Sequence, residues 1–221
     1  MIRALAVLAC AALAACGGGA ASPLQPTQIA SAPVSSCTPR VVSVALLGDS
    51  TMVGMDGASP GNQSVAPHNP GVELQADMDA RFGAGAVVVT DYGVAGSTAL
   101  QANPVKADVV VANYGINDMR TYGESIADYT AAMRAVGATL IETQNPIVGG
   151  STWNEDDFVA AAKGLGLPVA DTHTYVLGLS DWQSYLGPIG IHPDDALYVL
   201  IVDNVLAPAV AAQVAPLRCV Q

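Results

Sequence analysis

The chain has 221 residues, of which 51% are hydrophobic and 12% are charged, and its formal net charge at pH 7 is −11. This length is enough for one domain with a full hydrophobic core. Only eight residues are Lys or Arg, and they are scattered along the sequence, so no basic patch can form and nucleic acid is excluded as an expected partner.

The first residues have the pattern of a bacterial export signal. Arg3 is the only charge there, and the apolar stretch at 4–15 is too short to span a bilayer as a stable helix. The segment Leu13-Ala14-Ala15-Cys16 resembles the lipobox of bacterial lipoproteins, in which the cysteine becomes the lipidated first residue. Cys10 is a weaker candidate, and an ordinary secretory signal is the alternative. By the same resemblance, glycine rather than aspartate after Cys16 implies the outer membrane, facing the periplasm.

We therefore expect three segments. Residues 1–15 form the signal peptide, residues 16–38 form a flexible linker rich in Gly, Ala, Ser and Pro, and residues 39–221 form the domain. Cys37 and Cys219 flank this domain. An exported chain enters an oxidising compartment, so these two cysteines are expected to form a disulfide, with two unpaired cysteines as the alternative.

Continuous apolar runs alternate with helical patterns along the domain. The runs do not alternate between apolar and polar residues, as expected for parallel strands buried on both faces. Several of the helical patterns end in glycine, a common helix stop signal. The alternation predicts an α/β domain with a doubly wound parallel sheet. The four strong runs lie at 41–47, 86–90, 107–114 and 138–143, and a weaker one lies at 167–171.

The last helical pattern is apolar, at 196–216. It is interrupted by Asp203, Asn204 and Pro208, so it is interpreted as a helix that faces the core and not as a membrane span.

Polar residues follow the predicted strands, where open α/β sheets bind their ligands. Ser50 follows the first run, Gly96 lies in a glycine-containing turn after the second, and Asn117 follows the third. His192 comes just before the last predicted helix. A turn or a helix cap would explain each residue alone, but their order and placement together favour a site at this edge of the sheet.

These residue types suit acyl transfer. Ser50 would attack an ester carbonyl, and a neutral His192 would take its proton, because a serine hydroxyl is barely nucleophilic near neutral pH. The resulting oxyanion needs preorganised donors. The backbone N–H groups of Ser50 and Gly96 and the side-chain amide of Asn117 would supply them.

Four short motifs carry a resemblance to a family. They are "GDS" at 48–50, "DYGVAGST" at 91–98, "GIND" at 115–118 and "GIHP" at 190–193. In this order they resemble the blocks of the SGNH hydrolases, also called GDSL-type esterases and lipases. The resemblance implies a single three-layer α/β/α domain with a flavodoxin-like, parallel five-stranded sheet. It also implies Ser50 and His192 as catalytic residues and Ser50, Gly96 and Asn117 as the oxyanion hole.

One position departs from that pattern. The family usually has an acid three residues before the histidine, where this chain has Ile189. A backbone carbonyl, or Asp181 or Asp171 from a neighbouring loop, would then hold the imidazole, or the site is weakened. The expected function is hydrolysis of carboxylic esters, such as short acyl or O-acetyl groups on a small molecule or polysaccharide. The alternative is a noncatalytic envelope lipoprotein that binds its ligand without chemistry.

No metal or other cofactor is expected, because the sequence contains no H-x-x-x-H or C-x-x-C spacing. His173 is interpreted as a packed loop residue. Trp153 and Trp182 fall in predicted loops near the catalytic edge, where they would either line a substrate cleft or serve as packing residues.

Overall fold

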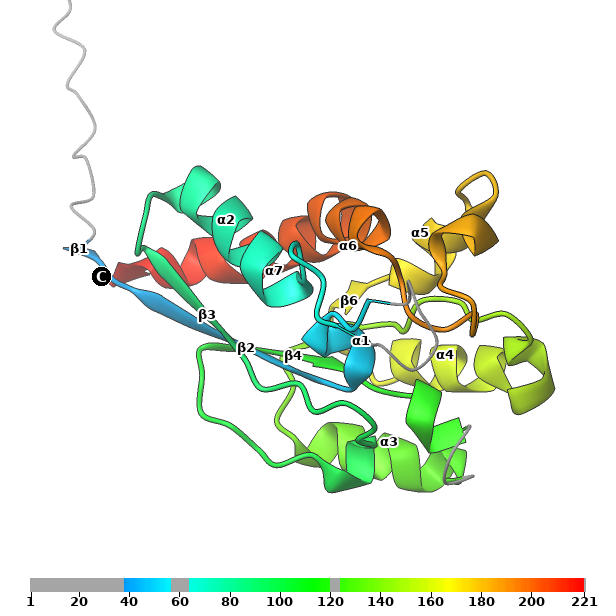
Figure 1. Cartoon of the computed structure of the whole chain (residues 1–221). Helices are drawn as coiled ribbons and strands as arrows, with labels where there is room; N and C mark the ends of the chain where they lie inside the picture. The colour runs from blue at the N-terminus through cyan, green and yellow to red at the C-terminus, as the bar shows by residue number, and fades with distance from the viewer. Residues whose placement is uncertain (1–37, 57–63, 120–123, 221) are drawn as a thin grey trace, which may run out of the picture. The chain divides into compact units, whose positions relative to one another are not determined.

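Five parallel strands form the central sheet in the order β3-β2-β4-β5-β6 (Figure 1). The computed structural model describes residues 38–56, 64–119 and 124–220, so Cys16 and Cys37 lie outside the described residues. Every strand of the sheet overlaps one of the five predicted runs, which confirms that prediction. The strands are β2 (Val42–Gly48), β3 (Val87–Asp91), β4 (Val109–Asn113), β5 (Leu140–Glu142) and β6 (Val169–Ala170).

Helices cover both faces of this sheet, which confirms the three-layer α/β/α arrangement (Figure 1). On one face lie α2 (Pro70–Phe82) and a C-terminal helix made of α6 (Asp195–Ile201), the π-helical turn η5 (Val202–Leu206) and α7 (Ala207–Val214). On the other face lie α3 (Ile126–Ala135) and α4 (Glu155–Lys163). The shorter elements are α1 (Ser50–Val53), α5 (Thr172–Leu177), and the 3-10 turns η1 (Ala99–Gln101), η3 (Gly150–Trp153), η4 (Trp182–Tyr185) and η6 (Ala215–Arg218).

The two faces of β2 explain why the apolar runs are continuous. Val44 and Leu46 pack against α2 and the C-terminal helix, whereas Ala45 and Leu47 pack with residues of α3 and α4. Because successive side chains point to opposite faces and both faces are covered, the four consecutive positions 44–47 are all apolar.

The C-terminal helical segment, Asp195–Arg218, is the one helix among the described residues that is long and apolar enough to cross a membrane by length and composition. Its buried residues Val202, Val210 and Val214 belong to the core cluster that includes Val44 of the sheet. This packing agrees with the prediction of a core-facing helix.

A second, two-stranded sheet joins the ends of the domain and was not predicted. Its strands, β1 (Thr38–Pro39) and β7 (Cys219–Val220), are antiparallel, with Pro39 opposite Cys219. Arg40 donates from Nε to the carbonyl of Leu217 at 2.7 Å, and Arg218 donates from Nη1 to the carbonyl of Arg40 at 2.6 Å. The two ends of the described chain are thus held together.

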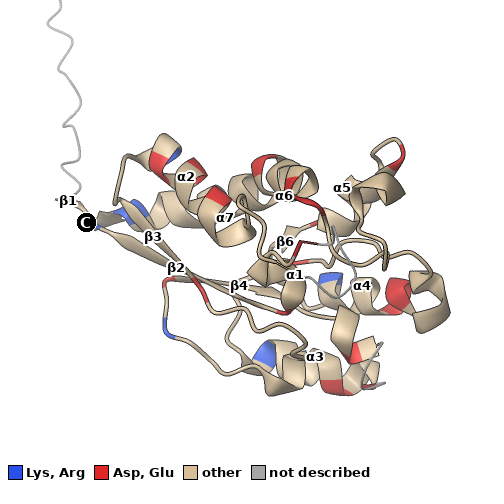
Figure 2. Cartoon of the chain, in the orientation of Figure 1, with Lys and Arg blue, Asp and Glu red and all other residues tan. Residues whose placement is uncertain are grey.

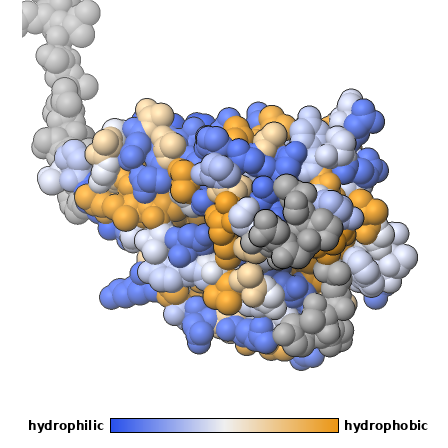
Figure 3. Space-filling model, viewed as in Figure 1, coloured by the Kyte–Doolittle hydropathy of each residue, from blue (hydrophilic) through white to orange (hydrophobic). Residues whose placement is uncertain are grey.

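The surface carries few positive charges. Figure 2 shows the Lys and Arg residues of the described chain dispersed among more numerous acids. On the face seen in Figure 3, apolar residues are interspersed with hydrophilic ones.

Candidate active site

The residues predicted to act together lie around one pocket. Ser50 begins α1 directly after β2, Gly96 lies in the loop after β3, Asn117 follows β4, and His192 precedes α6. The pocket has a volume of about 210 Å³. It is lined by Ser50, Ala95, Gly96, Ile116, Asn117, Ile189, Ile191 and His192.

Ser50 and His192 are in direct contact. The Oγ of Ser50 lies 2.8 Å from the Nε2 of His192, and both residues are buried. Which of the two atoms carries the shared proton depends on the imidazole tautomer. A serine hydroxyl bonded to an imidazole nitrogen is the arrangement that lets the imidazole take the serine proton during nucleophilic attack.

Close packing requires the glycine that ends β2. A Cβ atom at Gly48 would lie 2.4 Å from the Cβ of Met52 and 2.7 Å from the carbonyl oxygen of Asn113. No side chain fits there unless α1 moves away from β4. Gly48 therefore lets the chain turn sharply from β2 into α1 and places Ser50 at the edge of the sheet.

Asp49 caps α1 from a fully buried position. Its carboxylate accepts bonds from the backbone N–H and the hydroxyl of Thr51, both at 2.9 Å, and from the Nδ2 of Asn117 at 3.3 Å. Burial raises the pKa of Asp49 to about 6, although the bonds from Thr51 lower it. This carboxylate thus joins the helix that carries Ser50 to the loop that carries Asn117.

Asn117 is held by two acceptors. Its Nδ2 donates to the carbonyl of Ser97 at 3.0 Å and to Asp49 at 3.3 Å. Because both partners accept, the amide nitrogen faces them, and the residue also lines the pocket beside Ser50. An oxyanion at the pocket would compete with Asp49 for the more weakly bound N–H group.

The backbone conformation at position 96 favours glycine. Its φ is +81°, in the left-handed region that residues with a side chain rarely adopt, whereas a Cβ there would meet no atom within 4 Å. The loop is anchored to the end of β2, because Val94 N and Ser97 Oγ both donate to the carbonyl of Gly48.

Ile189 lies in the same pocket as Ser50 and His192, with 45% of its surface exposed. Asp171, one of the candidate substitutes for the acid, caps α5 and pairs with Lys163 at 2.7 Å. Asp181, the other candidate, is exposed at the start of η4 with a φ of +55°. The carboxylate of Asp171 is thus bound to a lysine.

Two buried residues at the end of β5 that lie close to the site were not identified from the sequence. Asn145 donates from Nδ2 to the carbonyl of Ile191, next to His192, at 3.0 Å. Glu142 accepts from the hydroxyl of Thr172 at 2.9 Å, and burial raises its pKa to about 7. A signal was present in the sequence, because the polar stretch "ETQN" at 142–145 lies at the end of the strand predicted at 138–143.

Among known proteins, similarity to this chain was found in solved structures. No family model matches the chain, and no curated protein matches its sequence. A lipase/acylhydrolase from Enterococcus faecalis superposes with a TM-score of 0.62 at 20% identity, covering 79% of this chain and 96% of that one.

Two esterase structures are similar to about the same degree. Axe2, an acetylxylan esterase from Geobacillus stearothermophilus, has a TM-score of 0.57 at 18% identity and covers 78% of this chain and 94% of that one. A carbohydrate acetylesterase family member from Sinorhizobium meliloti has a TM-score of 0.57 at 15% identity, covering 79% and 99%. The chain therefore has the fold of the SGNH hydrolases.

The buried carboxyl of Glu142 predicts a pH-dependent stability. Its pKa is about 7 in the folded protein against 4.5 for an ordinary glutamate, so the unfolded chain ionises first as the pH rises. Glu142 therefore lowers the free energy of unfolding progressively between pH 4.5 and 7. We expect Glu142→Gln to be more stabilising at pH 8 than at pH 5, by about 1–3 kcal/mol, in urea unfolding.

The matched control is Asp203→Asn, which removes an exposed carboxyl from the C-terminal helix. Its effect on the free energy of unfolding should be the same at both pH values. An equal effect of Glu142→Gln at pH 5 and pH 8 would contradict the prediction.

Proposed function

We propose that the chain is a serine esterase that hydrolyses short carboxylic esters. The observation that carries this proposal is the 2.8 Å contact between Ser50 Oγ and His192 Nε2 inside a pocket at the carboxyl edge of the sheet. The fold shared with lipases and acetylesterases supports it.

In the first step, Ser50 Oγ bonds to the ester carbonyl carbon while its proton passes to His192 Nε2. The oxyanion receives hydrogen bonds from the N–H groups of Ser50 and Gly96 and from the amide of Asn117. When the intermediate collapses, the bond to the alkoxy oxygen breaks and His192 protonates the departing alcohol. Water then attacks the acyl-enzyme in the same way and releases the acid.

A short acyl group suits this pocket. Its volume is about 210 Å³, and Ile116, Ile189 and Ile191 contribute to its lining. Two of the similar structures are named as an acetylxylan esterase and a carbohydrate acetylesterase family member. These names support an acetyl or other short acyl group carried by a small molecule or a polysaccharide.

A second candidate function follows from Ile189. The apolar side chain at the usual position of the acid favours a noncatalytic binding lipoprotein with the same fold. The two functions differ in whether Ser50 is activated.

Ser50→Ala should lower kcat/KM for p-nitrophenyl acetate by about 10³-fold or more and abolish labelling by a fluorophosphonate, because the nucleophile is gone. Asn117→Ala should lower kcat by about 10²–10³-fold while labelling of Ser50 remains detectable. Circular dichroism provides the folding control. If wild-type protein is neither labelled nor active, the binding function replaces the esterase.

Ile189→Asp should place a carboxylate in the pocket that contains His192. Position 189 is half exposed, so the charge keeps part of its hydration, and a carboxylate near the imidazole raises the pKa of His192. In the pH profile of kcat/KM, we expect Ile189→Asp to have a higher plateau and an acidic limb shifted to higher pH.

The matched control is Ile189→Asn, because asparagine has nearly the shape of aspartate without its charge. This variant should change neither the plateau value of kcat/KM nor the pH of the acidic limb. Asp171→Asn should also leave kcat/KM nearly unchanged, because Lys163 already binds that carboxylate. A large loss of activity in Asp171→Asn, or no difference between Ile189→Asp and Ile189→Asn, would contradict this account of the missing acid.

The chain is further proposed to be anchored in the cell envelope through lipidated Cys16, with its domain in the periplasm. A disulfide between Cys37 and Cys219 is part of this proposal. The pairing of β1 with β7 supports it, because Thr38, the neighbour of Cys37, lies opposite Val220, the neighbour of Cys219.

Mass spectrometry of the mature protein under non-reducing conditions tests both features. We expect an acylated N-terminal Cys16 and a peptide that joins residues 37 and 219. A disulfide closing a loop of this size stabilises by about 4–5 kcal/mol in the chain-entropy treatment, so Cys219→Ser should also lower the midpoint of urea unfolding. Free thiols at both positions, or a different N-terminus, would contradict the proposal.

A further inference from the structure

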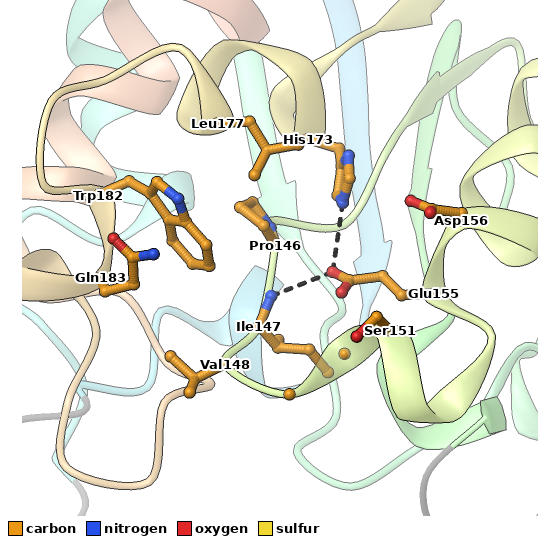
Figure 4. Close-up of a pocket in the computed structure, with 12 residues that line it drawn as sticks. Pro146, Ile147, Val148, Ser151, Glu155, Asp156, His173, Leu177, Trp182 and Gln183 are labelled. Carbon is orange, nitrogen blue, oxygen red and sulfur yellow. Dashed lines mark hydrogen bonds and ion pairs between the residues drawn. The ribbon is translucent and has the colours of Figure 1, made fainter.

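A second pocket lies at the carboxyl edge of the sheet, beside the ends of β5 and β6 (Figure 4). Its volume is about 310 Å³, at the lower end of the range for small-molecule sites. Four segments form it, namely the loop after β5, the start of α4, α5 and η4. Its lining includes Pro146, Ile147, Glu155, His173, Trp182 and Gln183.

The pocket contains two buried polar side chains. Those of His173 and Glu155 are 8% and 7% exposed, and His173 Nε2 lies 3.3 Å from Glu155 Oε1. That Nε2 has no hydrogen-bond partner among the described residues, and Glu155 Oε1 is also bonded to the N–H of Ile147 at 3.0 Å. Within the described part of the chain, His173 Nε2 thus has an ion-pair contact but no hydrogen bond, and because a buried polar atom without a hydrogen bond is unfavourable, a ligand hydroxyl at this position would be stabilising.

Gly150 makes room for this pair. A Cβ at Gly150 would collide with Glu155 Oε2, so only glycine lets the carboxylate turn into the pocket. Glu155 and His173 come from different helices, α4 and α5, and the fold brings them together at one wall.

The opposite wall is aromatic and amide-bearing. In Figure 4, Trp182 and Gln183 lie on one side and Glu155 and His173 on the other, with Pro146 between them. An aromatic face packs against the C–H face of a sugar ring, while carboxylate, imidazole and amide groups bond to its hydroxyls. An alkyl chain would instead leave the buried polar groups unpaired.

This pocket is next to the one that contains Ser50. Val148 lines it and donates its N–H to the carbonyl of Gly190 at 2.8 Å, while Ile189 and Ile191 on either side of Gly190 line the Ser50 pocket. A Cβ at Gly190 would lie 2.6 Å from the Cβ of Val148, so the two segments are in close contact. The segments that line the two pockets are thus joined by a direct backbone hydrogen bond.

We propose that the pocket binds one pyranose unit of a carbohydrate chain whose ester group reaches Ser50. This inference rests on the proposed esterase function for the role of the sugar, but binding of the sugar itself does not require hydrolysis. Trp182 provides the stacking face, and Glu155 and His173 bind hydroxyl groups.

Direct binding tests the site without any ester. Isothermal titration calorimetry with xylotetraose, cellotetraose and chitotetraose should show binding of at least one of them to the wild-type protein. Trp182→Ala should weaken that binding about tenfold, and Gln183→Ala, an exposed position, by a smaller factor. Tyr92→Ala is the matched control, because Tyr92 is an exposed aromatic residue outside this pocket, and it should leave binding unchanged.

Kinetics then separate this proposal from the esterase function. Trp182→Ala should raise KM about tenfold for an acetylated oligosaccharide of the sugar that binds, while kcat/KM for p-nitrophenyl acetate stays nearly constant. A wild-type protein that binds a sugar but hydrolyses neither ester would overturn the esterase and keep the sugar site. Hydrolysis without binding of any of the three sugars, or equal binding by Trp182→Ala, would overturn the sugar site.

Discussion

The buried carboxylate of Asp49 joins the segments on which the arrangement of the pocket depends. It accepts the backbone N–H of Thr51, which fixes the start of α1 and so the position of Ser50, and it accepts a side-chain N–H from Asn117 on the neighbouring strand end. Burial makes its ionised form unfavourable, and its pKa rises to about 6. Near neutral pH most of the carboxyl is ionised, and its acceptor capacity then holds both segments.

The loop that carries His192 is held by hydrogen bonds to backbone groups. Gly187 N donates to the carbonyl of His192, Val148 N donates to Gly190, and Asn145 donates to Ile191. These bonds restrict the loop on both sides of the imidazole. A chain with Ile189 in place of an acid therefore still brings the imidazole within 2.8 Å of Ser50. The loop fixes the position of the His192 imidazole, whereas a carboxylate would both position the imidazole and stabilise its charged form.

The sequence predicts the sheet and the grouping of Ser50, Gly96, Asn117 and His192 for one physical reason. Parallel strands end at the same edge, so residues that follow successive strands converge there whatever the details of packing. The antiparallel pair β1 and β7 could not be predicted in this way, because each strand is two residues long and their pairing joins opposite ends of the domain. The contact between Glu155 and His173 likewise depends on how α4 and α5 pack.

Buried acids gather at the edge that carries the pocket. Asp49, Asp118 and Glu142 each follow or adjoin a strand end, and burial raises the pKa of each. As the pH rises toward these raised pKa values, the unfolded chain ionises before the buried groups do, which lowers the stability of the folded chain. The rest of the sheet contains apolar residues that pack without such a penalty. Ser50 and His192 meet at this polar edge, where oriented polar groups can stabilise the charge that develops during the proposed ester hydrolysis.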